Sequence, residues 1–190
     1  METALATSVA IYLRLIDYKK SALTSNGTLD SNIANTSMFD AANPQFIKVS
    51  SYSSNVEQTL TIGSQSSGVG AGKIAFNPLQ ITKYLDAVSP ILFQKAAVGT
   101  PYQTAEIFFV NAQNAVAVKH VYKLVAVKTI SWSADSGSGV IENVTFDYGG
   151  QVIVVNKLGP DGKATDVVKM GWNKVRNIAD NDPDAIIDMK

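Results

Sequence analysis

The glycine-rich segment between Ser67 and Lys73 is the first place in this sequence where residue types and spacing could do chemistry. Its Gly-Lys ending suggests a phosphate-binding loop, which requires a glycine five positions before that glycine and a hydroxyl residue after the lysine. Ser67 occupies the first of these positions, and an apolar residue follows Lys73. Gly68, Gly70 and Gly72 also fail the spacing of the dinucleotide fingerprint. We therefore predict no nucleotide or other cofactor here, and interpret the segment as a flexible loop.

The only histidine, His120, limits the other catalytic possibilities. It excludes a metal site built on two histidines, and its place beside Lys119 in an expected strand favours a solvated or interface role over general-base catalysis. Asp135, Glu142 and Asp147 lie near one expected hairpin. Alternation places Glu142 and Asp147 on opposite sides of the strand, so a paired-carboxylate site is not supported. Because the chain also lacks cysteine, we predict that it is not an enzyme and holds no metal.

Composition indicates one folded domain. The 190 residues are 46% hydrophobic and 17% charged, and the basic and acidic residues both number 16. This balance gives no electrostatic reason to expect nucleic acid or an anionic membrane as partner. Arg14 and Asp17 interrupt the apolar start, so neither a signal peptide nor a membrane span is predicted. We expect a cytoplasmic product that is secreted without a cleavable leader.

The clearest helix signals lie between Ser89 and Gly99. Ser89 is a suitable N-cap, Pro90 suits the first helical position, and Gly99 suits the end of the last turn. Helical spacing predicts an apolar docking face. Its residues are Leu92, Phe93, Ala96 and Ala97.

The rest of the chain reads as short strands separated by turns. Strands are expected at 8–17, 46–62 (a strand pair or one long bent strand), 73–84 (with an interruption at Pro78), 105–110, 119–132, 140–148, 151–157 and 165–173. Strict alternation is expected along 119–132, and a turn at Gly149-Gly150. Residues 19–45 are expected to be a long loop or insertion. We place one domain at 1–178 and an acidic, flexible tail at 179–190, with a docking peptide through Ile186 and Ile187 as the alternative.

Several motifs together resemble the haemolysin-coregulated proteins (Hcp), the tube subunits of type VI secretion. Most of the specificity lies in residues 70–99. The matching residues are Gly70-Ala71-Gly72-Lys73, Thr82-Lys83-Tyr84, Asp86, Ser89-Pro90, Gly99, Glu142-Asn143-Val144-Thr145 and Gly171-Trp172-Asn173. The long segment 19–45 and the tail after Asn177 depart from the usual pattern.

The resemblance implies a small antiparallel β-barrel with one embedded helix that forms a homohexameric ring. Such rings stack into a hollow tube, which sheath contraction expels with a spike and which can hold small effectors. Sheath, baseplate and spike proteins are then the other partners. The loop 64–72 and the helix are the expected inter-subunit contacts. The motif residues chosen as candidates are Gly70, Gly72, Lys73, Tyr84, Asp86, Ser89 and Pro90.

Two alternatives remain open at the level of the sequence. A tail-tube protein of a phage or of another contractile injection system would have a related fold and the same mechanical role. A monomeric β-sandwich binding module would belong to a different functional class. The oligomeric state separates the binding module from the two tube proteins.

Overall fold

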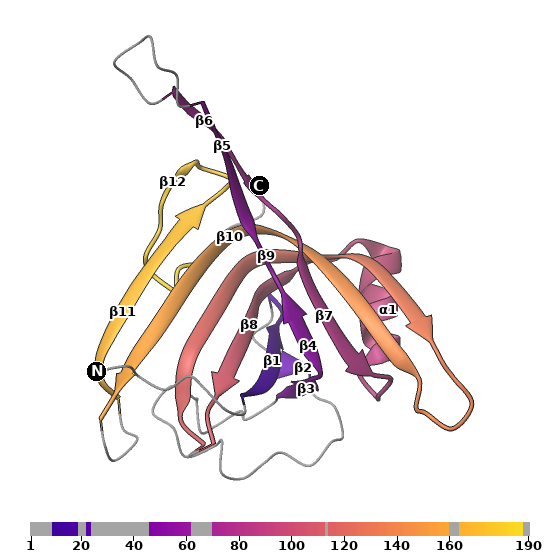
Figure 1. The fold of residues 1–190 in the computed structure, drawn as a ribbon. Helices are drawn as coiled ribbons and strands as arrows, with labels where there is room; N and C mark the ends of the chain where they lie inside the picture. Colours follow the sequence, from indigo (N-terminus) through magenta and orange to yellow (C-terminus); the bar gives the residue numbers. More distant parts are fainter. Residues whose placement is uncertain are drawn as a thin grey trace.

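Antiparallel strands make up most of the computed structural model, which describes residues 9–18, 22–23, 46–61, 70–112, 114–159 and 164–187 (Figure 1). One helix, α1 (Ser89–Val98), occurs in these residues, so the expected mostly-β fold with an embedded helix is confirmed. The strands are β1 (Ala10–Ile16), β2 (Ala22–Leu23), β3 (Ile47–Val49), β4 (Ser51–Ser53), β5 (Val56–Thr61), β6 (Gly70–Phe76), β7 (Leu79–Tyr84), β8 (Tyr102–Val110), β9 (Val116–Ser133), β10 (Ile141–Leu158), β11 (Ala164–Asn173) and β12 (Ile178–Ala179).

Two sequence expectations fall largely outside the described residues, and a third does so only at its end. The expected insertion at 19–45 is described only at β2, which pairs with the end of β1. Residues 64–69 of the expected glycine loop and the last three residues of the tail also lie outside, whereas residues 70–72 of that loop belong to strand β6.

The strands form a barrel-like circuit with one interruption. Antiparallel ladders join β7 to β10, β10 to β9, β9 to β8 and β8 to β1. β3 then pairs with β1, and β4 pairs with β7. Ser50 lies between β3 and β4, and its N–H donates to the Thr82 carbonyl (2.7 Å). Because β3 and β4 have different neighbours, the wall of the barrel is not a continuous sheet at Ser50.

β10 belongs to two parts of the molecule. Its residues 141–146 pair with β7 in the barrel, whereas residues 150–158 pair with β11. β9 follows β10 along both parts, and β8 pairs with β9 along residues 116–125, so the part of the sheet that carries β11 continues through β10 and β9 to β8.

The expected turn at Gly149-Gly150 is wrong, because β10 runs straight through it. A Cβ atom on Gly149 would lie 3.1 Å from a methyl of Val175, and one on Gly150 would lie 3.1 Å from a methyl of Ile187. These glycines therefore allow the segment after β11 to pass close to the strand.

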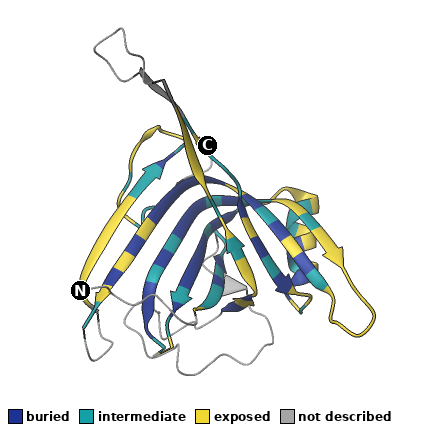
Figure 2. Cartoon of the chain, in the orientation of Figure 1, coloured by how far each residue is buried: buried dark blue, intermediate teal, exposed yellow. Residues whose placement is uncertain are grey.

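The main core lies inside the barrel. Figure 2 shows the buried residues along the middle of β9 and β10 and on β7, β8 and β1, whereas most of β11 and residues 56–59 of β5 are exposed. The core cluster is built from apolar residues of these strands and of α1, which alternate with outward-facing residues. Its largest fully buried members are Tyr102, Tyr122, Phe146, Leu13, Leu15, Ile47, Leu79, Ile81 and Leu92.

β5 and β6 form a separate two-stranded arm that projects from the body (Figure 1). The single long strand expected over 73–84 is therefore two strands, which pair in different sheets on either side of Asn77 and Pro78. Proline lacks the N–H that a ladder needs, which explains the break. The arm carries a bulge, because Gln58 pairs with Ile74 while Leu60 pairs with Ala71.

The expected alternation along β9 fails at two points. Leu124 has φ of 51°, so Tyr122 and Val125 both reach the main core although they are three residues apart. The register then shifts so that Lys128 is an extra residue on β9, and Val127 and Ile130 share a face. Both irregularities lie where β9 passes from its pairing with β8 to the part that pairs with β10 alone, and they bend the strand there.

The helix is present at the expected place, with two corrections. Its N-cap is Val88, which makes no capping side-chain bond, and Ser89 is the first helical residue. Of the predicted docking face, Leu92 is buried but Phe93 is largely exposed. At the other end Gly99 has φ of 73° and its N–H donates to the Lys95 carbonyl, as a glycine C-cap does.

The segment after β11, expected to be a flexible tail from residue 179, contacts the body through residue 187. Asp180 forms an ion pair with Lys123 (2.8 Å), and the Asp182 carbonyl accepts a hydrogen bond from the same ammonium. Ile187 is buried, and its carbonyl accepts a hydrogen bond from the Tyr18 hydroxyl (3.0 Å). We call residues 178–187 the C-terminal strap.

Candidate functional site

The sequence motifs converge on a buried polar cluster between α1 and the barrel. Lys83 on β7 and Glu142 on β10 form an ion pair of 2.8 Å with both side chains fully buried. Ser89 donates to Glu142 (2.8 Å) and accepts from Lys83 (2.9 Å). Asp86 pairs with Lys83 (2.8 Å), and Trp132 Nε1 donates to the other oxygen of Glu142 (2.8 Å). Each charge in the cluster thus has a partner, as burial requires.

The strand register explains why these residues meet. Glu142 lies directly opposite Lys83 on one side of β10 and opposite Trp132 on the other, so one face gathers all three side chains. Asp86 then accepts a bond from the N–H of Val88, which begins the helix. The cluster therefore fastens the first turn of α1 to the strands, and its geometry indicates a structural role.

The candidate residues fall into two groups. Tyr84 is 63% exposed and Pro90 is also exposed, whereas Ser89 is only 3% exposed and bonds within the chain. Gly70, Gly72 and Lys73 lie apart from them, on strand β6 of the arm. The sequence analysis did not predict that Lys83 and Trp132 would both contact Glu142. Their common signal, a register that places both opposite Glu142, appears only once the strands are paired.

The lone histidine lies in an aromatic cluster at the open end of the core. The Tyr52 hydroxyl bonds with His120 Nδ1 (2.7 Å) and with the Tyr122 hydroxyl, and Gln151 donates to Tyr122 (3.2 Å). Burial lowers the pKa of His120 to about 4 and raises the pKa of Tyr52 and Tyr122. A neutral imidazole bonded to a tyrosine, with no nucleophile among these contacts, supports packing rather than general-base chemistry.

A second charged group lies on the opposite face of the wall. Glu106 on β8 pairs with Arg14 on β1 and with Lys119 on β9 (3.3 Å). Both cations also approach the ring of Phe108, at 5.7 and 5.9 Å from its centroid. Lys119, the neighbour of His120 in β9, is thus buried and paired within the chain.

A hollow of about 370 Å³ opens between β9, β10 and the end of β11. Leu124, Gly149 and Val175 form its apolar part. Its cation, Lys174, lies 4.3 Å from the ring centroid of Tyr148 and 3.4 Å from Asp147. In the described ranges no group of three histidine or acidic residues is placed to hold a metal ion.

Solved structures with a similar fold come from type VI secretion. One, described as a type six secretion system protein, covers 91% of this chain and 100% of its own, with 20% identity and a TM-score of 0.75. Hcp1 from Salmonella typhimurium has 20% identity and a TM-score of 0.62, over 91% and 99% of the chains. A type VI secretion system effector from Yersinia pestis has 12% identity and a TM-score of 0.62, over 86% and 98%. No curated protein matches the sequence.

The fold of this chain is thus the barrel-like, mostly-β fold of these solved structures. The family model described as type VI secretion system effector, Hcp, matches residues 34–154, more than half of the sequence. The chain belongs to the Hcp family, which is a family of structural tube proteins rather than of enzymes. As far as the structure is described, α1 is too short to cross a membrane.

Proposed function

We propose that the protein assembles into hexameric rings that stack into the hollow tube of a type VI secretion system. Membership in the Hcp family supports the role of tube subunit. Contraction of the sheath would expel the tube, and small effectors would travel in the lumen of the tube. The partners of the protein would be the sheath, baseplate and spike proteins. Secretion by this route needs no cleavable leader.

The observation that carries the proposal is an open strand edge on β11. β10 covers one side of β11 along residues 164–173, whereas on the other side the described strands pair only at Trp172 and Asn173, through β12. Along 164–170 no described strand lies on this side of β11, and an edge of this kind is a template for another chain, although the N–H of Val167 donates to Asp166 Oδ1 (2.8 Å). A contact of this kind that joins unlike surfaces and is repeated by rotation closes into a ring.

The arm supports the stacking of rings. It projects beyond the body, and its strand β6 carries Gly70, Gly72 and Lys73 (Figure 1). We include these residues, with the exposed Tyr84 and Pro90, among the inter-subunit contacts. Ser89 and Asp86 would act indirectly, because their side chains hold α1 in place.

Light scattering after size exclusion, with negative-stain images of the same fraction, tests the proposal. Six subunits of 20.3 kDa give roughly 122 kDa. We expect this mass and rings with an open centre. A 20.3 kDa monomer at high concentration would overturn the proposal and favour a binding module.

A further inference from the structure

The face of the sheet that forms the core remains uncovered on the far side of Tyr52. Ile153 pairs with His120 on one side and with Met170 on the other, so these three side chains share the core face. Val155 and Val168 are a pair two residues further along on the same face. We call Ile153, Val155, Val168 and Met170 the β-face; all four are exposed, Met170 at 66%.

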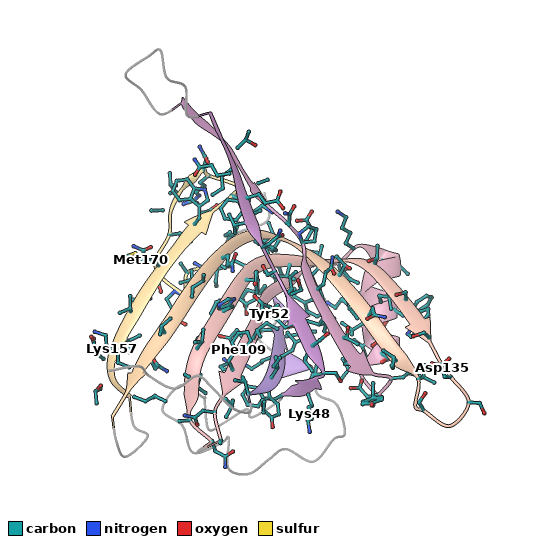
Figure 3. The ribbon with its side chains drawn as sticks, in the orientation of Figure 1. Lys48, Tyr52, Phe109, Asp135, Lys157 and Met170 are labelled. Atoms are coloured by element: carbon teal, nitrogen blue, oxygen red, sulfur yellow. The ribbon has the colours of Figure 1, made fainter. Side chains whose placement is uncertain are left out.

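The borders of the β-face are plain in the structure. The Tyr52 and Phe109 rings (5.2 Å) close the core at its inner end, and the exposed Lys157–Asp166 ion pair (2.8 Å) lies at its outer end. Figure 3 shows Met170 and Lys157 on the outlying part of the sheet, away from Tyr52 and Phe109. The β-face is thus an apolar surface with a charged rim, which is typical of an interaction site.

The opposite face of the same strands has a cover within the chain. Val121, Val152 and Val154 form a buried cluster there. Lys123 points to this face and is held by the C-terminal strap through Asp180. This part of the sheet therefore has one face that the chain partly covers and, opposite it, the exposed β-face, with the open edge of β11 beside it.

A second exposed apolar site lies at the other end of the molecule. Phe93 on α1 and Trp132 on β9 are both about half exposed, with ring centroids 6.2 Å apart. β8 pairs with β9 no further than Val125, so in the described strands residues 126–133 pair only with β10. We call Phe93, Trp132 and this edge of β9 the helix end. In Figure 1, β11 and α1 lie on opposite sides of the body.

We propose that the β-face and open edge of β11 in one copy receive the helix end of a second copy. The inference rests on the proposed function and specifies which two surfaces are in contact between neighbouring subunits of the ring. Each surface combines a strand edge with apolar side chains on one side of it, so pairing the edges would place α1 over the β-face. Because the surfaces are unlike and lie at opposite ends, the contact is head-to-tail and repeats from copy to copy.

Cysteine cross-linking tests this pairing, since the chain has no cysteine of its own. The variant with Val168→Cys and Phe93→Cys, treated with a short bismaleimide, should give a ladder of covalent oligomers on a denaturing gel. The matched control is Val167→Cys with Phe93→Cys. Val167 and Val168 are 50% and 46% exposed, but Val167 pairs with Asn156 and so belongs to the other face. The control should stay predominantly monomeric on the gel.

The outcomes separate this inference from the proposed function. Rings in the micrographs with equal cross-linking of both variants, or none of either, would overturn the pairing and leave the ring intact. Cross-linking of Val168→Cys alone to itself would indicate a symmetric dimer and also overturn the pairing. Absence of rings in the unmodified protein would overturn the proposed function first.

A charge substitution on β11 gives a second test of the inference. Val168→Lys should reduce the ring fraction at least tenfold, whereas Val167→Lys should leave most protein in rings. Far-ultraviolet circular dichroism of both variants checks that they fold. Rings from folded Val168→Lys at the level of the unmodified protein would contradict the inference.

Discussion

Ser89 on α1 donates a hydrogen bond to Glu142 on β10, with 2.8 Å between the two oxygens, although 53 positions separate the residues in the chain. Both side chains are buried, and Lys83 shares the site without exposure to solvent. The helix is thus held to the barrel by a polar contact within an otherwise apolar boundary. A buried ion pair contributes little net stability when intact, but loss of one partner leaves a charge without compensation.

Glu142→Gln should destabilise the protein by roughly 1–3 kcal/mol, because the buried carboxylate that accepts bonds from Ser89 and Trp132 loses its charge. Lys83 loses one of its two ionic partners and keeps the other, Asp86. Urea unfolding of the monomeric fraction measures the change. The matched control is Asp166→Asn, which removes the carboxylate of the exposed Lys157–Asp166 pair and should have a much smaller effect. Equal effects of the two substitutions would contradict a special role of the buried cluster.

Gly171→Ala should loosen the C-terminal strap. A methyl group at this position would lie 2.5 Å from the Gln151 carbonyl oxygen and would also overlap that of Asp180, and backbone atoms cannot rotate away. We expect a loss of about 1–3 kcal/mol and faster hydrogen exchange in residues 180–187.

The control for that substitution is Gly139→Ala. Its methyl would meet only the exposed Tyr84 ring, at 3.3 Å, which can move. Unchanged exchange in the strap of Gly171→Ala would show that the close approach does not hold the segment.

Local signals in the sequence identified most strands, the helix and its glycine C-cap. Alternation and turn residues depend on neighbours in the chain, and these act in the same way before and after folding. Gly149-Gly150 shows where such reasoning ends. A glycine pair indicates a turn because glycine is flexible. Here the pair lies in a continuous strand, and its missing side chains leave room for Val175 and Ile187 to pack against that strand. The need for this room arises from residues far along the chain.

The candidate site shows the same limit. Ser89 and Asp86 were found by a family motif, but the part that each plays follows from Lys83 and Glu142. Ser89 has the chemistry of an N-cap. The local pattern could not reveal that the hydroxyl of Ser89 would instead hydrogen-bond with the buried Lys83–Glu142 ion pair. The exposed β-face was likewise hidden, because a strand read alone does not show which of its faces a partner covers.

His120 should make stability depend on pH in a defined window. Burial lowers its pKa from 6.5 to about 4, so the unfolded chain binds the proton first as the pH falls. Stability from this group is fully present above pH 6.5 and is lost between 6.5 and about 4, by roughly 3 kcal/mol at most. His120→Gln should remove this part of the pH dependence.

The single imidazole can be followed by proton NMR without overlap from other histidines. Its chemical shift should titrate near pH 4 in the folded protein. A midpoint near 6.5 would mean that the ring is solvated, and that the contact with Tyr52 does not keep it neutral.

The arm offers a test of stacking that leaves the body unchanged. Gly72 lies at the bulge of the β5–β6 ladder, where two residues of β6 face one of β5, and Gly70 pairs with Thr61. Bulky residues at these positions, Gly70→Val with Gly72→Val, should block ring or tube formation and leave the fold intact, because the arm pairs only within its own sheet in the described structure. Circular dichroism measures whether the variant folds, and light scattering measures whether it forms rings or tubes.

The control is Ser138→Val at the exposed β9–β10 hairpin, which adds similar bulk away from the arm. Unchanged rings and tubes in the glycine double variant would remove the arm from the inter-subunit contacts, whereas a lost fold with lost rings would show that the glycines act within the subunit.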